Sequence, residues 1–223
     1  MKKTYFTRDF LDFFKELAAN NHKEWFDDNR KRYEKNVKDP FKHFVSDLIH
    51  EISKDDPRID IEAKDTIFRI NRDIRFSKDK TPYKLDRSAI ISAAGRKDHS
   101  IPGFYLSLGP ANTYLGGGAY FLKPEQLQKL RSHISRNNRE FEKLINQDAF
   151  TAHFDGIKGE KNKRLPKEFT EAAEKQPLLY NKQFYYMAEC PAKWAVADDL
   201  MDRCLEYYRA SFPIQNFLFE AVQ

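Results

Sequence analysis

The spacing of apolar residues changes near residue 57 of this 223-residue chain, and no other feature of the sequence limits the fold as strongly. Before that point, from Phe10 to Ile52, apolar side chains recur every three or four residues, as in amphipathic helices. After it, period-two alternation predicts short strands at 67–76, 88–93, 104–108 and 113–115. Helical spacing returns at Pro124, and a further strand is predicted at 183–188.

The predicted strands are joined by short connections that contain glycine and proline, including Gly116, Gly117 and Gly118. None of these connections has room for a crossover helix, so the strands should pair antiparallel. The order of elements predicts an α+β fold with a mainly antiparallel sheet flanked by N-terminal and C-terminal helices. We expect one domain over 1–223, with a helical part at 7–54, a sheet-rich part at 58–122 and a helical part with a returning strand at 123–223.

Prolines and polar residues predict where the helices begin and end. Asp39 and Pro40 should start a new helix, with Asp39 as its cap, and Pro213 should separate a helix at 196–210 from a last one. Asn21 and Glu24 have the spacing of a capping box. Asn29 interrupts an aromatic stripe, and its expected role is to brace a loop.

Composition predicts a cytoplasmic protein. Apolar residues make up 40% and charged residues 33%, so the chain can bury a core. Cys190 and Cys204 form no disulfide framework and lie in no zinc-binding pattern, so we expect reduced thiols. The chain has no apolar run long enough for a membrane span, and it reaches charged residues before any signal-peptide core. The six histidines lack metal-site spacing, so no metal site is expected.

Positive charge is concentrated in two segments. Residues 69–84 hold six basic and two acidic residues, a net charge of +4, and residues 158–167 hold five basic and one acidic residue, also +4. The whole chain carries +5, so the remaining residues carry 5 − 8 = −3. The two segments are therefore where an anionic partner would bind.

Within the first segment, alternation separates the arginines. It places Arg69, Asn71, Asp73 and Arg75 on one face of the predicted strand and Phe68, Ile70, Ile74 and Phe76 on the other. Arg72 falls on the apolar face, where a guanidinium is costly unless it is paired or a bulge turns it outward. On a straight strand Arg69 and Arg75 would be about 20 Å apart, too far to share one phosphate. A single anion site therefore needs the chain to bend, or the following loop to fold back.

That loop mixes hydroxyl and ammonium groups, which suits phosphate or carboxylate binding, although it matches no established phosphate-binding loop. The predicted ligand-binding residues are Arg69, Arg72, Arg75, Ser77, Lys78, Lys80, Lys84, Arg164 and Lys167. Asp73 and Tyr83 are the only nearby acid–base candidates. The alternative interpretation is that the arginines form a solvated strand face and the lysines a solvated hairpin.

The stretch from Arg69 to Lys84, Arg-Ile-Asn-Arg-Asp-Ile-Arg-Phe-Ser-Lys-Asp-Lys-Thr-Pro-Tyr-Lys, resembles the signature of an uncharacterised family, the Domain of Unknown Function numbered twenty-four sixty-one. Similarity extends to most of the chain, at Asn21, Glu24, Trp25, Phe26, Asn29, Tyr33, 115–118 and 163–169. Leu85, Asp86 and Arg87 replace the small polar residues of the family pattern. The resemblance implies a conserved intracellular domain, and it carries over no reaction, cofactor or catalytic residue.

Three classes of function agree with these observations. The first is an enzyme or small-ligand binder whose pocket on the sheet recognises a phosphorylated or carboxylated compound, with Arg69, Arg72 and Arg75 as clamps. The second is a nucleic-acid-binding domain in which both basic segments follow a backbone and Tyr83 or Phe104 stacks on bases. The third is a protein-interaction module in which the arginines form an internal network with Asp73, Asp79 and Glu62. The sequence leaves the ligand, the reaction, the cofactor and the oligomeric state open.

Overall fold

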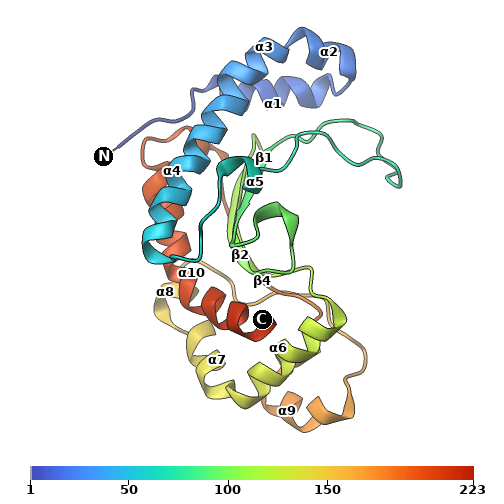
Figure 1. Ribbon diagram of the computed structural model, residues 1–223. Helices are drawn as coiled ribbons and strands as arrows, with labels where there is room; N and C mark the ends of the chain where they lie inside the picture. The colour runs from blue at the N-terminus through green and yellow to red at the C-terminus, as the bar shows by residue number, and fades with distance from the viewer. Residues whose placement is uncertain (1) are drawn as a thin grey trace.

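The computed structural model describes residues 2–223, so Met1 lies outside it. Helices occupy both ends of the chain and a four-stranded antiparallel sheet lies between them (Figure 1), which confirms the predicted α+β class. The α-helices are α1 (Asp9–Ala19), α2 (Lys23–Asp28), α3 (Arg30–Tyr33), α4 (Asp39–Asp55), α5 (Ala63–Thr66), α6 (Pro124–Arg136), α7 (Asn138–Ile145), α8 (Asp148–Thr151), α9 (Thr170–Lys175) and α10 (Leu200–Val222). Short 3₁₀ or π turns are η1 (Glu34–Lys38), η2 (Gly95–Lys97), η3 (Lys167–Phe169), η4 (Pro177–Tyr180) and η5 (Ala192–Val196).

The sheet consists of β1 (Arg87–Ile91), β2 (Gly103–Leu108), β3 (Asn112–Ala119) and β4 (Phe184–Pro191), in that order across the sheet. The strands predicted at 88–93, 104–108, 113–115 and 183–188 are confirmed with small shifts of their ends. The prediction that Gly116 to Gly118 form a connection is wrong, because β3 continues through them. A Cβ atom on Gly116 would lie 2.3 Å from the Tyr186 carbonyl oxygen of the adjacent β4, so only glycine lets the two strands approach this closely.

Helices cover one face of the sheet. Figure 1 shows α4 and α10 along the same side of the strands, and among the strands α10 packs mainly against β3. Alternate strand residues such as Ala89, Leu106 and Leu115 are fully buried against them, as period-two alternation requires. The buried apolar side chains of residues 2–223, apart from Phe169, form one continuous core from Phe6 to Val222.

Two prolines were predicted to begin or separate helices. The first prediction is confirmed in part: α4 begins at Asp39 with Pro40 in its first turn, but the Asp39 side chain caps nothing, and α4 follows α3 through the π turn η1 without a break. The wider turn tolerates the missing proline N–H. Pro213 lies within α10, and buried residues on both sides of it, such as Tyr208 and Phe217, hold the helix against the core. The prediction of two C-terminal helices is therefore wrong, because tertiary packing outweighs the local cost of proline. No helix within residues 2–223 combines the length and the apolar character needed to cross a membrane.

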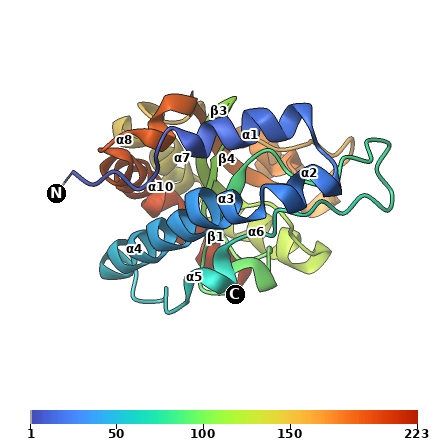
Figure 2. The ribbon, with the colours of Figure 1, turned by 90° about the horizontal axis from the view of Figure 1, so that it is seen from above.

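Residues 67–86 form a two-limbed projection, which we call the arm (Figures 1 and 2). The prediction of a regular strand at 67–76 is wrong. The limbs meet at a single bridge between Asn71 and Tyr83, supported by hydrogen bonds from Arg72 N to Pro82 O (2.8 Å) and from Lys84 N to Ile70 O (2.8 Å). Beyond that point the arm extends past α2 into solvent, and Phe76 at its tip is 95% exposed. With no neighbouring element to bury the apolar face, alternation alone does not make a strand there.

Candidate functional site

The tip of the arm is held together by its own charges. Arg72 Nη1 donates to Asp79 Oδ2 (2.5 Å), to Thr81 O (3.1 Å) and to the Thr81 hydroxyl. Hydrogen bonds from Thr81 N and from Arg72 hold the pKa of Asp79 down at about 2. Arg72 was the residue out of phase with the alternation, and its half-buried guanidinium is indeed paired.

Arg75 is also paired within the arm. Its Nη2 donates to Asp73 Oδ2 (2.7 Å), and this bond lowers the pKa of Asp73 to about 2. A carboxylate with so low a pKa is a weak base at neutral pH, and Asp73 lies on the exposed limb. Asp73 is thus poorly suited to acid–base chemistry. Glu62, the third predicted member of an internal network, instead faces Lys64 at 2.7 Å.

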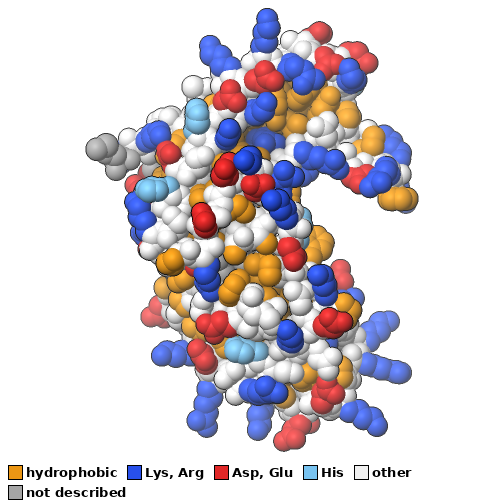
Figure 3. All heavy atoms as spheres, viewed as in Figure 1, with side chains coloured by type: hydrophobic (Ala, Val, Ile, Leu, Met, Phe, Trp, Pro, Cys, Tyr) orange, Lys and Arg blue, Asp and Glu red, His pale blue; other side chains and the backbone are white. Residues whose placement is uncertain are grey.

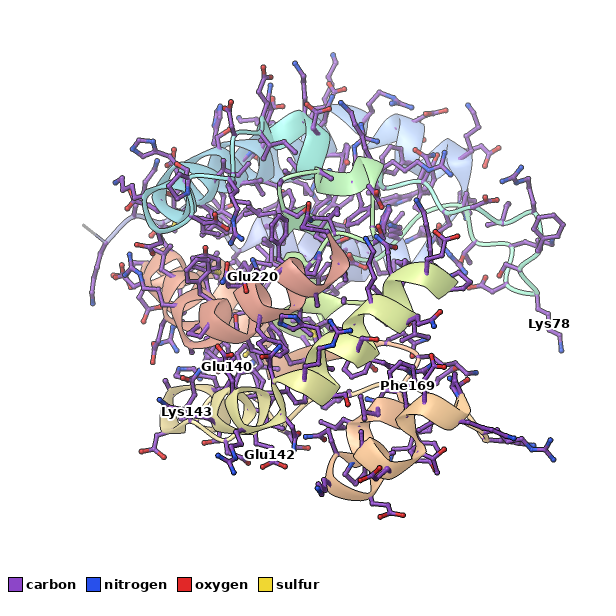
Figure 4. The ribbon with its side chains drawn as sticks, turned by 60° about the horizontal axis from the view of Figure 1, so that its bottom comes forward. Lys78, Glu140, Glu142, Lys143, Phe169 and Glu220 are labelled. Carbon is purple, nitrogen blue, oxygen red and sulfur yellow. The ribbon has the colours of Figure 1, made fainter. Side chains whose placement is uncertain are left out.

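The lysines of the arm do not converge on one point. Lys80 Nζ donates to Ile74 O (2.9 Å), which closes the loop that contains Ser77. Lys78 extends into solvent at the tip (Figure 4). The Lys84 ammonium lies 5.2 Å from the centre of the Phe68 ring, and burial lowers its pKa. These lysines therefore stabilise the arm or extend from it into solvent, and they do not line a common cavity.

The second basic segment lies at the other end of the molecule. Arg164 and Lys167 are exposed, next to η3 and α9, which Figure 1 shows at the opposite end from the arm. Figure 4 gives the same result from another direction, with Phe169 of η3 well separated from Lys78. The structure therefore does not bring Arg164 to Arg72 and Arg75.

A cavity of about 330 Å³ opens where the root of the arm meets α2, α3 and η1. We call it the basic cleft. It is lined by Phe26, Arg30, Tyr33, Glu34, Lys38, Arg69, Ile70, Asn71, Tyr83 and Arg87. Four of these residues are cationic and one is a carboxylate, so the lining carries 4 − 1 = +3. Figure 3 shows basic side chains gathered where the arm leaves the helices.

Arg87, the first residue of β1, is the most unusual side chain of the cleft. It is only 6% exposed, and burial lowers its pKa. Its Nη1 donates to Phe68 O (2.9 Å) and its guanidinium lies 5.4 Å from the centre of the Phe41 ring, whereas its Nε has no partner. Within residues 2–223, no carboxylate lies within 4 Å of it. Arg87 is therefore a buried cation without a counterion.

Another buried arginine shows what a satisfied environment looks like. Arg131 on α6 is 5% exposed, and it donates from Nε to Leu179 O (2.8 Å) and from Nη2 to Asn181 O (3.1 Å). Arg131 ties a turn to a helix and has no missing partner at Nε. The Arg87 guanidinium is also buried, but its Nε has no hydrogen-bond partner. Such an atom is rare unless a ligand or water completes the site.

The other cations of the cleft differ in how far they are neutralised. Arg30 Nη2 lies 2.5 Å from Asp27, and Lys38 lies 3.8 Å from Glu34. Arg69 is exposed, and no ion pair of it is present in the part of the chain that the structure describes. Arg69 and Arg87 thus carry the charge that remains available to a ligand.

Aromatic rings and one amide fix the walls of the cleft. The Tyr83 ring stacks on Phe26 at 4.1 Å and 15°, and the Phe26 and Tyr33 ring centres are 5.0 Å apart. Asn21 Nδ2 donates to Tyr83 O (2.9 Å), and Tyr83 N donates to Asn21 Oδ1 (3.1 Å), so the amide pairs with the arm as a strand would. Burial raises the pKa of Tyr33, and the Arg87 charge opposes this rise.

The predicted roles of the two asparagines are corrected by this arrangement. Asn29 donates only to Trp25 O (3.0 Å) within its own helical segment, so it braces no loop. Asn21 braces the arm instead, and His22 caps α2 by accepting from Trp25 N (3.4 Å). The predicted capping box is therefore wrong, because the Asn21 side chain is used by Tyr83.

The family model described as "conserved hypothetical protein (DUF2461)" matches residues 9–217. The chain belongs to the DUF2461 family. The suspected resemblance is thus confirmed, and the matched part contains the arm and every lining residue of the basic cleft. No curated protein matches this DUF2461 chain. Family membership assigns no reaction or ligand to the cleft.

Sequence reasoning found Arg69 and Tyr83 and missed Arg87, Arg30 and Lys38. The signal for Arg87 was present, because the alternation that makes Ala89 and Ile91 core residues also places Arg87 on their face, two residues earlier. Arg30 and Lys38 lie on helices far from the arm in sequence, and no local pattern predicts their approach.

Proposed function

We propose that the protein binds an anionic small molecule, carrying a phosphate or carboxylate group, in the basic cleft. The observation that carries this proposal is Arg87, a buried guanidinium that has no carboxylate partner and lines a cavity whose lining has a net charge of +3. Burying an uncompensated charge is costly, and an anion seated beside it would remove much of that cost.

Arg69 complements Arg87 from the solvent side. Arg69 is exposed whereas Arg87 is buried, so an anion entering between the arm and the helices would contact one guanidinium from each direction. Guanidinium groups bind the oxygens of phosphate and carboxylate in pairs, with charge-assisted hydrogen bonds. The Tyr83 ring on one side of the cleft, and Arg30 and Lys38 on the helical side, would limit the size of the anion that fits.

The proposal concerns binding, and it leaves the reaction open. Glu34 is the only carboxylate among the described residues that line the cleft, and it faces Lys38. Tyr33 and Tyr83 supply hydroxyl groups nearby, of which Tyr83 was the predicted acid–base candidate. In an enzymatic role, one of these hydroxyl groups would act as the general acid or base towards the bound anion.

The test is thermal unfolding in inorganic phosphate, pyrophosphate and citrate, with sodium chloride matched for ionic strength. A ligand at about 100 times its Kd stabilises the native state by about 2.7 kcal/mol, a clear rise in Tm. We expect Arg87→Met to abolish this rise and to leave the ligand-free protein folded, because the substitution removes a buried charge. Arg75→Gln is the matched control, since Arg75 is paired with Asp73 on the exposed limb, and it should keep the full response.

Two results would overturn the proposal. One is the absence of any anion-dependent rise beyond that of sodium chloride. The other is an unchanged response in Arg87→Met. Binding of single-stranded oligonucleotides that weakens steeply with salt, without a response to small anions, would favour the nucleic-acid alternative. Phe104 would not contribute to that alternative by stacking, because it is fully buried.

A further inference from the structure

A second pocket lies on the sheet face that the helices leave uncovered, on the other side of the arm root from the basic cleft. Its volume is about 330 Å³, at the lower end of the range for small-ligand sites. Ile90, Tyr105 and Met187 line it from three strands, and they alternate with the residues that face the core. We call it the aromatic pocket. Figure 3 shows the surface hollowed beneath the arm, on the side where this face lies.

Six rings follow one another around this pocket. Phe68 of the arm lies 6.4 Å from Tyr105 and 5.5 Å from His99, and His99 lies 5.4 Å from Phe121. Tyr120 continues the row, 4.8 Å from Phe121 and 5.1 Å from Tyr185. Rings from the arm, two loops and two strands thus converge on one space.

The pocket is open where its rings are most exposed. Phe121 is 61% and Tyr120 is 48% exposed, which is unusual for large aromatic side chains. Gly117 and Gly118 also line the pocket, and they present no side chain that would cover the strands. A flat ligand can therefore reach both the ring faces and the sheet.

The charges around the pocket select among ligands that bind aromatic rings. None of its described lining residues is acidic, and the Lys84 ammonium already lies over the Phe68 ring at 5.2 Å. A quaternary ammonium ligand would meet a like charge without a counterion, although aromatic cages often bind such cations. His99 and the tyrosine hydroxyls offer hydrogen bonds, which favour a ring that contains heteroatoms over a hydrocarbon.

We propose that the aromatic pocket binds the planar heteroaromatic ring of a free small molecule, of the nucleobase type, by stacking. This proposal uses residues that are absent from the basic cleft and does not depend on the anion proposal. The two sites are nevertheless adjacent, because Phe68 lines the aromatic pocket and Arg69, the next residue, lines the basic cleft.

The test uses neutral ligands, so that the basic cleft does not contribute. Adenosine, guanosine, uridine and riboflavin are titrated by calorimetry or ligand-observed NMR, with tetramethylammonium as the cationic comparison. We expect saturable binding of at least one ring compound and about tenfold weaker binding in Phe121→Ala, as for the loss of one stacking partner. Phe76→Ala is the matched control because Phe76 is 95% exposed at the arm tip, outside the pocket, and this variant should bind the ring compounds as the wild type does.

Tyr120→Ala provides a second exposed position in case Phe121→Ala alters the loop. The proposal is overturned if none of the four ring compounds binds saturably, or if tetramethylammonium binds and they do not. It is equally overturned if both alanine variants bind as tightly as the wild type, or if only oligonucleotides bind.

Discussion

The arm tip and the basic cleft use the same residue type in opposite ways. At the tip, Arg72 and Arg75 each face a carboxylate a few residues away, Asp79 and Asp73. In the cleft, Arg69 and Arg87 face no carboxylate of the described chain within ion-pairing distance. All four lie within 19 residues of sequence, so local composition does not distinguish them.

The difference shows that the residues of a basic motif have to be separated into those with a carboxylate partner and those without one before the motif is assigned a function. A paired guanidinium is neutralised by its carboxylate partner and loses side-chain freedom in the pair. Its charge therefore attracts a ligand only weakly. An unpaired and buried one retains its full charge in a medium where charge interacts strongly. The arginines that are paired within the arm and those that keep an unpaired charge in the basic cleft are therefore different residues.

The largest expected effect separates the root of the arm from its tip. Tyr83→Ala should lower the free energy of unfolding by about 3 kcal/mol, because Tyr83 is 6% exposed and stacked on Phe26. Phe76→Ala should change it by less than about 0.5 kcal/mol. Urea unfolding measures both values. Similar values for the two variants would mean that the arm root is not packed as described.

Next in size is the contrast between the two arginine pairs. Arg69→Gln combined with Arg87→Met should remove anion-dependent stabilisation, about 2.7 kcal/mol at 100 times Kd. Arg72→Gln combined with Arg75→Gln should retain it, while the ligand-free Tm falls because the links to Asp79 and Asp73 are lost. Thermal unfolding with and without pyrophosphate measures both quantities. Loss of the anion response in the second pair would show that the tip contributes to the site.

A smaller effect is expected at the link between the arm and the helices. Asn21→Ala removes two hydrogen bonds to the Tyr83 backbone and should cost about 1–2 kcal/mol. Asn29→Ala removes one bond inside a helical segment, to Trp25 O, and should cost less. Urea unfolding compares them, and hydrogen exchange at the Tyr83 amide should accelerate only in Asn21→Ala.

The smallest effect is a pH dependence confined to the tip. The folded-state pKa of Asp79 is about 2, below its ordinary value of 3.8, so its contribution to stability is present above pH 4 and is lost as the pH falls towards 2. Asp79→Asn should therefore be less stable than the wild type at pH 6, and the difference should shrink between pH 4 and pH 2. Acid titration of both proteins by circular dichroism measures this. A constant difference across that range would contradict the Arg72–Asp79 pairing.

The sequence predicted the fold class because the switch of apolar period reflects which faces are buried. Strands 88–93 and 104–108 were identifiable since their alternate residues contact the core. The segment 67–76 alternates in the same way and yet is no regular strand, because no element covers its apolar residues beyond Ile70. The continuous core from Phe6 to Val222 supports the proposal of one domain.

The candidate site was predictable only in part. The motif from Arg69 to Lys84 contains four residues that line the basic cleft, but pairing distances decide which of its charges are free. Arg72 could be recognised as special from its phase, although not that Asp79 and Thr81 satisfy it. Arg30 and Lys38 enter the cleft through helix packing, which no local spacing encodes. The aromatic pocket likewise requires loops and strands that are distant in sequence.

The adjacency of Phe68 and Arg69 has a consequence for how the arm can change. In an extended backbone consecutive side chains point in opposite directions, so a one-residue insertion or deletion before Phe68 would exchange the two surroundings. A ring would then enter the cationic side, and a guanidinium the side lined by rings. Length is therefore fixed more strictly than composition at the root of the arm. Near Phe76, where neither side is enclosed, loops of different length can be exchanged at little cost.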